Sequence, residues 1–161
     1  MKKVFLSLVA VLLCGVTFAQ TPERDTEGRI KIGSPEEFLK IGTTGYSTSD
    51  SYILTENIDL GDLGNRPSSI IPSFSGTFDG DGKTIKYQAG FEGVSGTIDY
   101  SLFGSVSGTI KNLNVNADVT LGGTVDNMNV ALICGSLTSS GVIEYCNVSG
   151  NVNSTVDPTL G

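Results

Sequence analysis

The chain has 161 residues, no histidine or tryptophan, and a formal net charge of −7. Its 17 acidic residues outnumber the 10 basic ones and would be repelled by a phosphate backbone, so the composition disfavours nucleic-acid binding. The 21 glycines, together with abundant Ser, Thr, Asn, Val and Ile, are typical of many short strands joined by tight turns. A chain of this length fits one domain.

The first residues have the pattern of a secretory signal peptide. Two lysines precede an apolar run over 4–16, which is shorter than the roughly 17 to 25 residues needed to span a bilayer. We predict a signal peptide over 1–19, cleaved between Ala19 and Gln20, and a secreted or cell-surface protein without a transmembrane segment. Lipidation at Cys14 is a weaker interpretation, because a leucine precedes that cysteine where a small residue is usual.

The next segments predict a tether and a short helix. Residues 20–33 are mostly polar and lack a period, which favours a mobile tether. Ser34 can cap a helix, Pro35 suits its first turn, Glu37 completes a capping box, and Gly42 ends it. We expect this helix to cover the N-terminal end of the strands that follow.

From Ser51 onward the apolar residues alternate, which predicts strands, and one segment is repeated. Ile85, Ile110 and Ile143 recur at offsets of 25 and 33 residues, as expected of a solenoid. The chief matches of the two clearest copies are Phe103 with Cys134, Gly104 with Gly135, Gly108 with Gly141, Ile110 with Ile143, Leu113 with Cys146, and Val115 with Val148. Upstream, Thr84-Ile85-Lys86 resembles Thr109-Ile110-Lys111.

These repeats predict an all-β fold: a right-handed parallel β-helix of about three coils over 34–161. We expect Ile85, Ile110 and Ile143 to form one aliphatic ladder. The other inward positions are Leu113, Cys146, Val115 and Val148. Cys134 and Cys146 are expected to be separate buried side chains, although a disulfide is a second possibility in an oxidising compartment.

The repeat resembles the GLUG-motif family of bacterial secreted and surface proteins. The matching residues are Leu102-Phe103-Gly104, Gly108-Thr109-Ile110-Lys111-Asn112-Leu113, and Gly141 through Gly150. The resemblance implies a β-solenoid outside the cell, often within a long adhesin-like protein, and we expect further repeats after residue 161. Some relatives carry an immunoglobulin A peptidase domain, but this chain has no histidine for a zinc peptidase site. Leu132-Ile133-Cys134 departs from the Gly-rich start of the motif.

Few residues have the pattern of a chemical site. Asp79 and Asp81, in an Asp-Gly-Asp-Gly turn, are weak calcium candidates, because calcium takes six to eight oxygens and a structural turn is the simpler interpretation. Other carboxylates are scattered and no histidine can activate a serine. No cofactor is expected.

The predicted function is a non-enzymatic surface module used for adhesion or as a rigid spacer. A glycan-binding module is the alternative, and a polysaccharide lyase or hydrolase is less favoured. The expected partner is a surface ligand, either a glycan or a surface protein.

Overall fold

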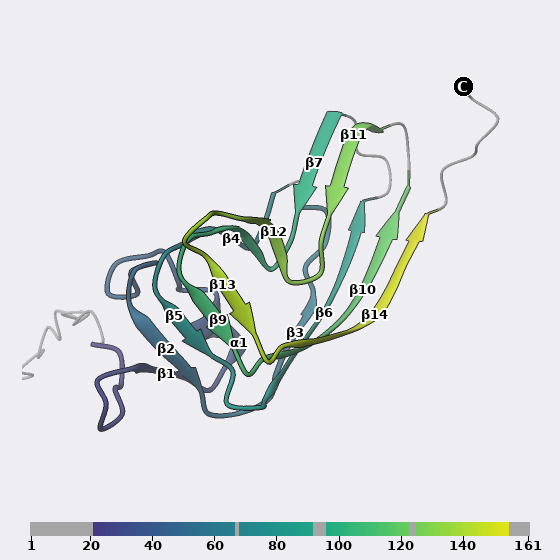
Figure 1. The fold of residues 1–161 in the computed structure, drawn as a ribbon. Helices are drawn as coiled ribbons and strands as arrows, with labels where there is room; N and C mark the ends of the chain where they lie inside the picture. Colours follow the sequence, from purple (N-terminus) through teal and green to yellow (C-terminus); the bar gives the residue numbers. More distant parts are fainter. Residues whose placement is uncertain (1–20, 67, 92–95, 123–124, 155–161) are drawn as a thin grey trace, which may run out of the picture.

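The chain is a parallel β-solenoid. The computed structural model describes residues 21–66, 68–91, 96–122 and 125–154, so the predicted signal peptide with Ala19 and Gln20 lies outside the described residues. Every strand pair in this part of the chain is parallel, and strands far apart in sequence lie side by side (Figure 1). The predicted all-β solenoid of about three coils is confirmed.

Four sheets run along the solenoid. The first contains β1 (Ile30–Ile32), β2 (Ser51–Leu54), β5 (Thr77–Asp79), β9 (Thr109–Lys111) and β13 (Val142–Glu144). The second contains β3 (Ile58–Asp62), β6 (Thr84–Phe91), β10 (Asn114–Leu121) and β14 (Asn147–Ser154). The third contains β4 (Ile71–Phe74), β8 (Phe103–Val106) and β12 (Cys134–Leu137), and the fourth contains β7 (Gly96–Tyr100) and β11 (Val125–Val130).

Each coil contributes strands to the first, second, fourth and third sheets, in that order along the chain. The strands β5, β6, β7 and β8 make one turn, and β9 to β12 make the next. An earlier turn consists of β2, β3 and β4, with a bridge from Ser68 to Asp99 at the position of the fourth sheet. The strands β13 and β14 begin a further turn and form the last described rung.

One short helix, α1 (Pro35–Phe38), lies before β2. The Ser34 hydroxyl accepts a hydrogen bond from the backbone N–H of Glu37 at 3.2 Å, so the predicted N-cap is present. Phe38 is fully buried and meets Phe78 and Phe103 edge-on, with ring centroids 5.8 and 6.1 Å apart. The helix therefore contributes one aromatic side chain to the core of the early coils. Within the described residues, no helix is long and apolar enough to cross a membrane.

The predicted tether over 20–33 is wrong for the residues that the structure describes. The strand β1 pairs in parallel with β2, and Ile30 and Ile32 are fully buried. Arg24 forms an antiparallel bridge with Ile30, which folds the preceding segment back on β1. Two alternating isoleucines form too short a pattern to predict a strand within a polar segment. Their burial depends on the pairing of β1 with β2.

The predicted ladder of Ile85, Ile110 and Ile143 is wrong at Ile85. Ile110 does pair with Ile143, but its partner in the preceding coil is Phe78. Ile85 pairs with Val115 in the second sheet, and Val115 pairs with Val148. The corner between β5 and β6 has four residues, 80–83, whereas the corner between β9 and β10 has only two, Asn112 and Leu113. Phe78 of β5 already occupies the position beside Ile110, so the Thr-Ile-Lys of β6 matches Thr109-Ile110-Lys111 in residue type but belongs to the next sheet.

The glycines that recur before the first sheet are required by close backbone contact between coils. A Cβ atom placed on Gly108 would overlap the carbonyl oxygen of Gly76, and one on Gly141 would overlap the carbonyl oxygen of Val106. Since L-residues with a side chain cannot approach so closely, these positions accept only glycine. The recurring glycine thus sets how tightly each coil stacks on the one before.

Replacing Ile110 by alanine should lower the free energy of unfolding by about 2–5 kcal/mol, because the side chain is fully buried between Phe78 and Ile143 and leaves a cavity. Ile143→Ala is the matched control. It removes the same atoms from a partly exposed position and should cost less. Denaturant melts measure both values, and a loss below about 0.5 kcal/mol for Ile110→Ala would contradict its place in the core.

Candidate functional site

A groove of about 810 Å³ lies on the outside of the solenoid, where the third and fourth sheets meet. It crosses successive coils, because Ser68, Asp99 and Asn129 occupy the same position on neighbouring rungs. Ser105 and Ser136 also face one another across β8 and β12. The groove therefore presents similar polar groups at each rung along the solenoid axis.

The polar groups of the groove are ordered by hydrogen bonds between coils. The Asn129 side-chain amide donates to the Asp99 carboxylate at 2.7 Å. The hydroxyls of Ser69 and Ser101 lie 2.8 Å apart, and Ser101 donates to the carbonyl of Phe103 at 2.7 Å. Among the described residues that line the groove, Asp99 is the only charged one. This surface suits an uncharged ligand rich in hydroxyl groups better than a polyanion, which the Asp99 carboxylate would repel.

Tyr100 contributes backbone but no aromatic platform to this groove. Its ring is 1% exposed and packs against Tyr87 and Phe91 at centroid distances of 6.1 and 5.0 Å. Among the described residues its hydroxyl has no hydrogen-bond partner, and burial raises its pKa. Tyr46, Tyr52 and Tyr87 are buried as well, so all four of these tyrosines pack in the core.

Tyr145 differs from the other tyrosines. It is 81% exposed and lies at the corner between β13 and β14, with φ of 54°. The equivalent corner of the preceding coil holds Asn112, whose φ is 53° and whose residue type tolerates this conformation better.

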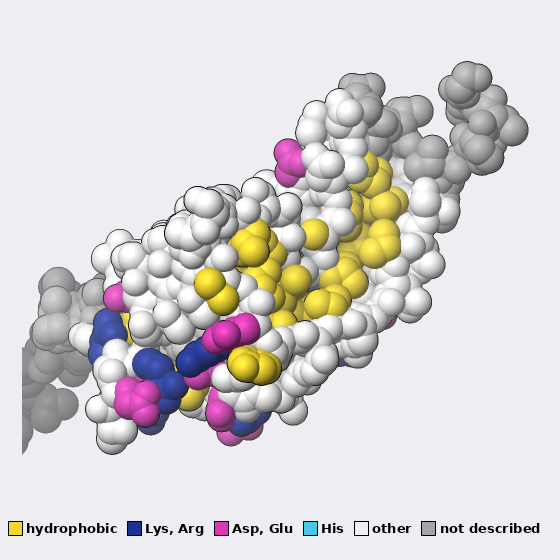
Figure 2. All heavy atoms as spheres, viewed as in Figure 1, with side chains coloured by type: hydrophobic (Ala, Val, Ile, Leu, Met, Phe, Trp, Pro, Cys, Tyr) yellow, Lys and Arg dark blue, Asp and Glu magenta, His cyan; other side chains and the backbone are white. Residues whose placement is uncertain are grey.

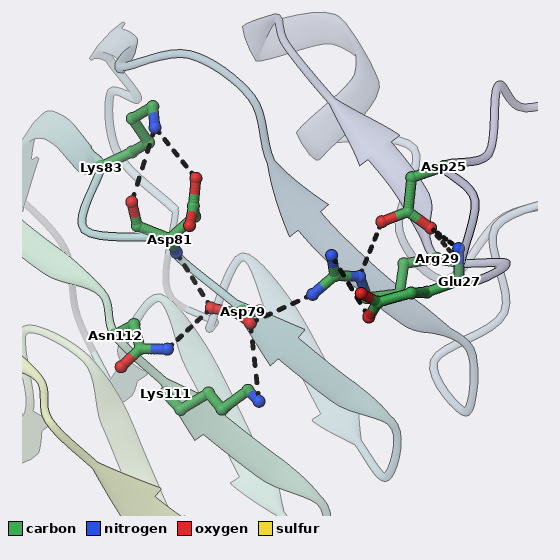
Figure 3. A network of polar contacts seen from close by, with 8 residues as sticks. All are labelled: Asp25, Glu27, Arg29, Asp79, Asp81, Lys83, Lys111 and Asn112. Carbon is green, nitrogen blue, oxygen red and sulfur yellow. Dashed lines mark hydrogen bonds and ion pairs between the residues drawn. The ribbon is translucent and has the colours of Figure 1, made fainter.

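The structure separates the two calcium candidates, Asp79 and Asp81. Asp79 points into a cluster of nitrogen donors from three parts of the chain (Figure 3). Arg29 Nη1 lies 3.3 Å and Lys111 Nζ 3.5 Å from Asp79 Oδ2. The Asn112 amide and the backbone N–H of Asp81 each donate to Asp79 Oδ1 at 3.0 Å. Asp81 carries its carboxylate outward, to an ion pair with Lys83 at 3.1 Å.

The surroundings of Asp79 stabilise its charged form. Burial by itself raises the pKa of this carboxyl, but the hydrogen bonds from Asn112 and the Asp81 N–H, together with Lys111, outweigh burial and lower the pKa from 3.8. Protein cations therefore occupy the side of Asp79 that a calcium ion would need. In the described part of the chain no group of three or more acidic, cysteine or histidine side chains could hold a metal ion.

Asp79 serves as an anchor for the N-terminal strand. Arg29 immediately precedes β1, and besides Asp79 it contacts Asp25 at 2.8 Å and Glu27 at 3.5 Å. Lys111 ends β9 in the following coil. One carboxylate thus joins β1, the corner after β5 and the corner after β9. The sequence did not reveal this cluster, because Arg29 and Asp79 are 50 residues apart.

Cys134 and Cys146 are free in the structure, and each is only half-buried. Cys134 begins β12, the outer strand of the third sheet, and Cys146 lies between β13 and β14, the outer strands of the first and second sheets, so no described strand covers either cysteine. Burial raises the pKa of both thiols, so neither is activated as a nucleophile. Their side chains complete the edge of the core, as their alignment with Phe103 and Leu113 indicates.

Comparison of the chain with family models, with curated proteins and with solved structures finds no match. The resemblance to the GLUG-motif family stays a prediction.

Replacing Asp79 by asparagine should lower the free energy of unfolding at neutral pH by about 1–3 kcal/mol, because Arg29 and Lys111 lose their shared anion. The Asp79 pKa is lowered in the folded chain, so its contribution is present above the ordinary value of 3.8 and is lost as pH falls below it. Denaturant melts should therefore show that the difference in the free energy of unfolding between the unmodified chain and Asp79→Asn decreases as the pH falls below 3.8. Asp81→Asn is the control, and an equal loss there would refute the anchoring role of Asp79.

Proposed function

We propose that this chain is a non-enzymatic module presented outside the cell, where it acts as a rigid spacer or an adhesion surface. The observation that carries the proposal is the continuous stack. Inward side chains of successive coils pair directly, as Phe78 does with Ile110 and Ile85 with Val115. Each coil thus lengthens a single core, which suits a stiff extended element. The export pattern and the GLUG-like repeats support placing it at the cell surface.

The arrangement of the carboxylates also favours a non-enzymatic role. Asp62 and Asp118 line a second, shallower hollow on the second sheet. Each accepts a hydrogen bond, Asp62 from the N–H of Gly64 at 2.8 Å and Asp118 from the Asn151 amide at 2.9 Å. Both carboxylates thus serve contacts within the protein, whereas glycoside hydrolysis needs an acid and a base placed on either side of the bond that is cleaved.

An assay for polysaccharide cleavage tests the non-enzymatic part of the proposal. The purified chain, incubated with neutral and uronate-containing polysaccharides, should release neither new reducing ends nor unsaturated uronates. Accumulation of either product in proportion to the amount of chain would overturn the proposal. If the product persisted in Asp62→Asn and Asp118→Asn variants, it would come from another site.

A glycan-binding module is the second candidate, and the groove between the third and fourth sheets favours it. The groove has the size of a ligand site, runs across several coils and is rich in hydroxyl and amide groups. Its repeated polar rungs suit an extended, uncharged chain of sugars. This ligand would lie across Asp99, Asn129 and the neighbouring serines.

Asn129→Ala should weaken binding of any glycan that the chain retains on an array by at least about fivefold, since the variant removes a donor that is held in place by Asp99. Asn151→Ala is the matched control, because it removes the same kind of asparagine–aspartate rung outside the groove. Titration calorimetry measures both variants. If both variants weakened saturable binding equally, the ligand would bind outside the groove. If no glycan on the array bound, the spacer function would remain the favoured proposal.

A further inference from the structure

The groove between the third and fourth sheets repeats the same surface on three successive rungs. Its floor contains Pro72, Gly104 and Gly135, which lie side by side because β4, β8 and β12 pair in register. The two glycines place no side chain in the groove, so the floor stays open along the solenoid axis. Since the groove lies on the outside of the solenoid, a rung added at either end would lengthen it and would not cover it.

Both walls of the groove offer polar groups to a ligand. Asp99 and Asn129 belong to the fourth sheet, and Ser105 and Ser136 belong to the third. Asn129 donates to Asp99 Oδ1 at 2.7 Å. Among the described residues, Asp99 Oδ2 and the hydroxyls of Ser105 and Ser136 form no hydrogen bond within the chain. The second and third rungs therefore have, on each side of the floor, a polar side chain that can bind a ligand.

The spacing of the rungs favours an extended glycan over a peptide. Neighbouring strands lie about 4.8 Å apart, so the paired groups recur at this interval along the groove. This interval is close to the length of one sugar residue in an extended β-1,4-linked chain. The side chains on one face of an extended peptide recur only about every 6.7 Å and would fall out of step with the rungs. An α-1,4-linked glycan coils and cannot follow a straight floor.

We propose that the groove binds an uncharged, β-1,4-linked polysaccharide that lies parallel to the solenoid axis, with about one sugar residue on each rung. The inference rests on the glycan-binding function above and adds the linkage, direction and register of the ligand. The flat face of each sugar lies on Pro72, Gly104 or Gly135, and the hydroxyl groups at its edges reach the two walls.

The charge of the groove restricts the ligand further. On the face drawn in Figure 2, charged side chains gather mainly over the first sheet, away from the junction of β11 and β12. Asp99 supplies the only charge among the described residues that line the groove. Its free oxygen accepts hydrogen bonds from hydroxyl groups, and its charge repels the carboxylates of a uronate chain. The ligand is therefore a neutral glycan, such as a chain of glucose, mannose or xylose.

A length series of oligosaccharides tests the axial arrangement. The purified chain is titrated in a calorimeter with β-1,4-linked oligomers of glucose, mannose and xylose, from the disaccharide to the hexasaccharide. In at least one series the affinity should rise about threefold or more with each added residue until the rungs are filled. Maltohexaose, an α-1,4-linked hexasaccharide, is the control and should not bind.

The outcomes separate this inference from the glycan-binding function on which it rests. Affinity that is independent of length, or equal affinity for maltohexaose, would refute the axial arrangement while glycan binding stood. If no oligomer of the three series bound, the inference would be wrong. Binding of other glycans on the array would then decide whether the glycan-binding function is wrong as well.

Substitutions in single rungs test the register. Ser105→Ile fills the middle rung with a branched side chain and should weaken binding of the hexasaccharide at least about tenfold. Ser136→Ile fills only the last described rung, so the disaccharide should bind as before and the hexasaccharide should bind no better than the disaccharide. Asn116→Ile is the matched control, because Asn116 is an exposed strand residue outside the groove. Unchanged binding in Ser105→Ile, or equal losses in all three variants, would overturn the proposal.

Discussion

A parallel coil buries its inward side chains only when another rung lies on each side of it, and this requirement governs the whole molecule. Ile110 has Phe78 on one side and Ile143 on the other, and it is fully buried. Val148 has a neighbour on one side alone and stays 47% exposed. The core is therefore a property of neighbouring coils, and the stability of each coil depends on the next.

The two ends of the solenoid satisfy this requirement to different degrees. At the N-terminal end, β1 covers the first sheet, Phe38 enters the aromatic core, and Arg29 ties β1 to Asp79. The Asp79 carboxylate, with its lowered pKa, is part of this closure and has no separate chemical role. At the other end the described strands leave an apolar face with few charges. The same physical rule thus explains the closed N-terminal end and the exposed valines of the last described strand.

The corners between sheets determine which residues meet. Gly108 allows the backbone of one coil to touch that of the preceding coil, and Asn112 turns the chain with a positive φ while donating to Asp79. Where Tyr145 takes the place of Asn112, the backbone keeps the same conformation but the side chain points to solvent. The corner backbone is therefore constrained, whereas the corner side chain can vary and supply surface properties.

The sequence by itself determined the fold class and the inward positions of the later coils, because alternation and recurring glycines are local signals. Ile110, Leu113 and Val115 are buried as predicted. Only the tertiary structure decided which sheet each residue joins, since Phe78 takes the position beside Ile110 and Ile85 lies beside Val115. It also brought Arg29 to Asp79 and aligned Asp99 with Asn129. Contacts between coils depend on which strands pair, and a short repeated motif does not reveal that pairing.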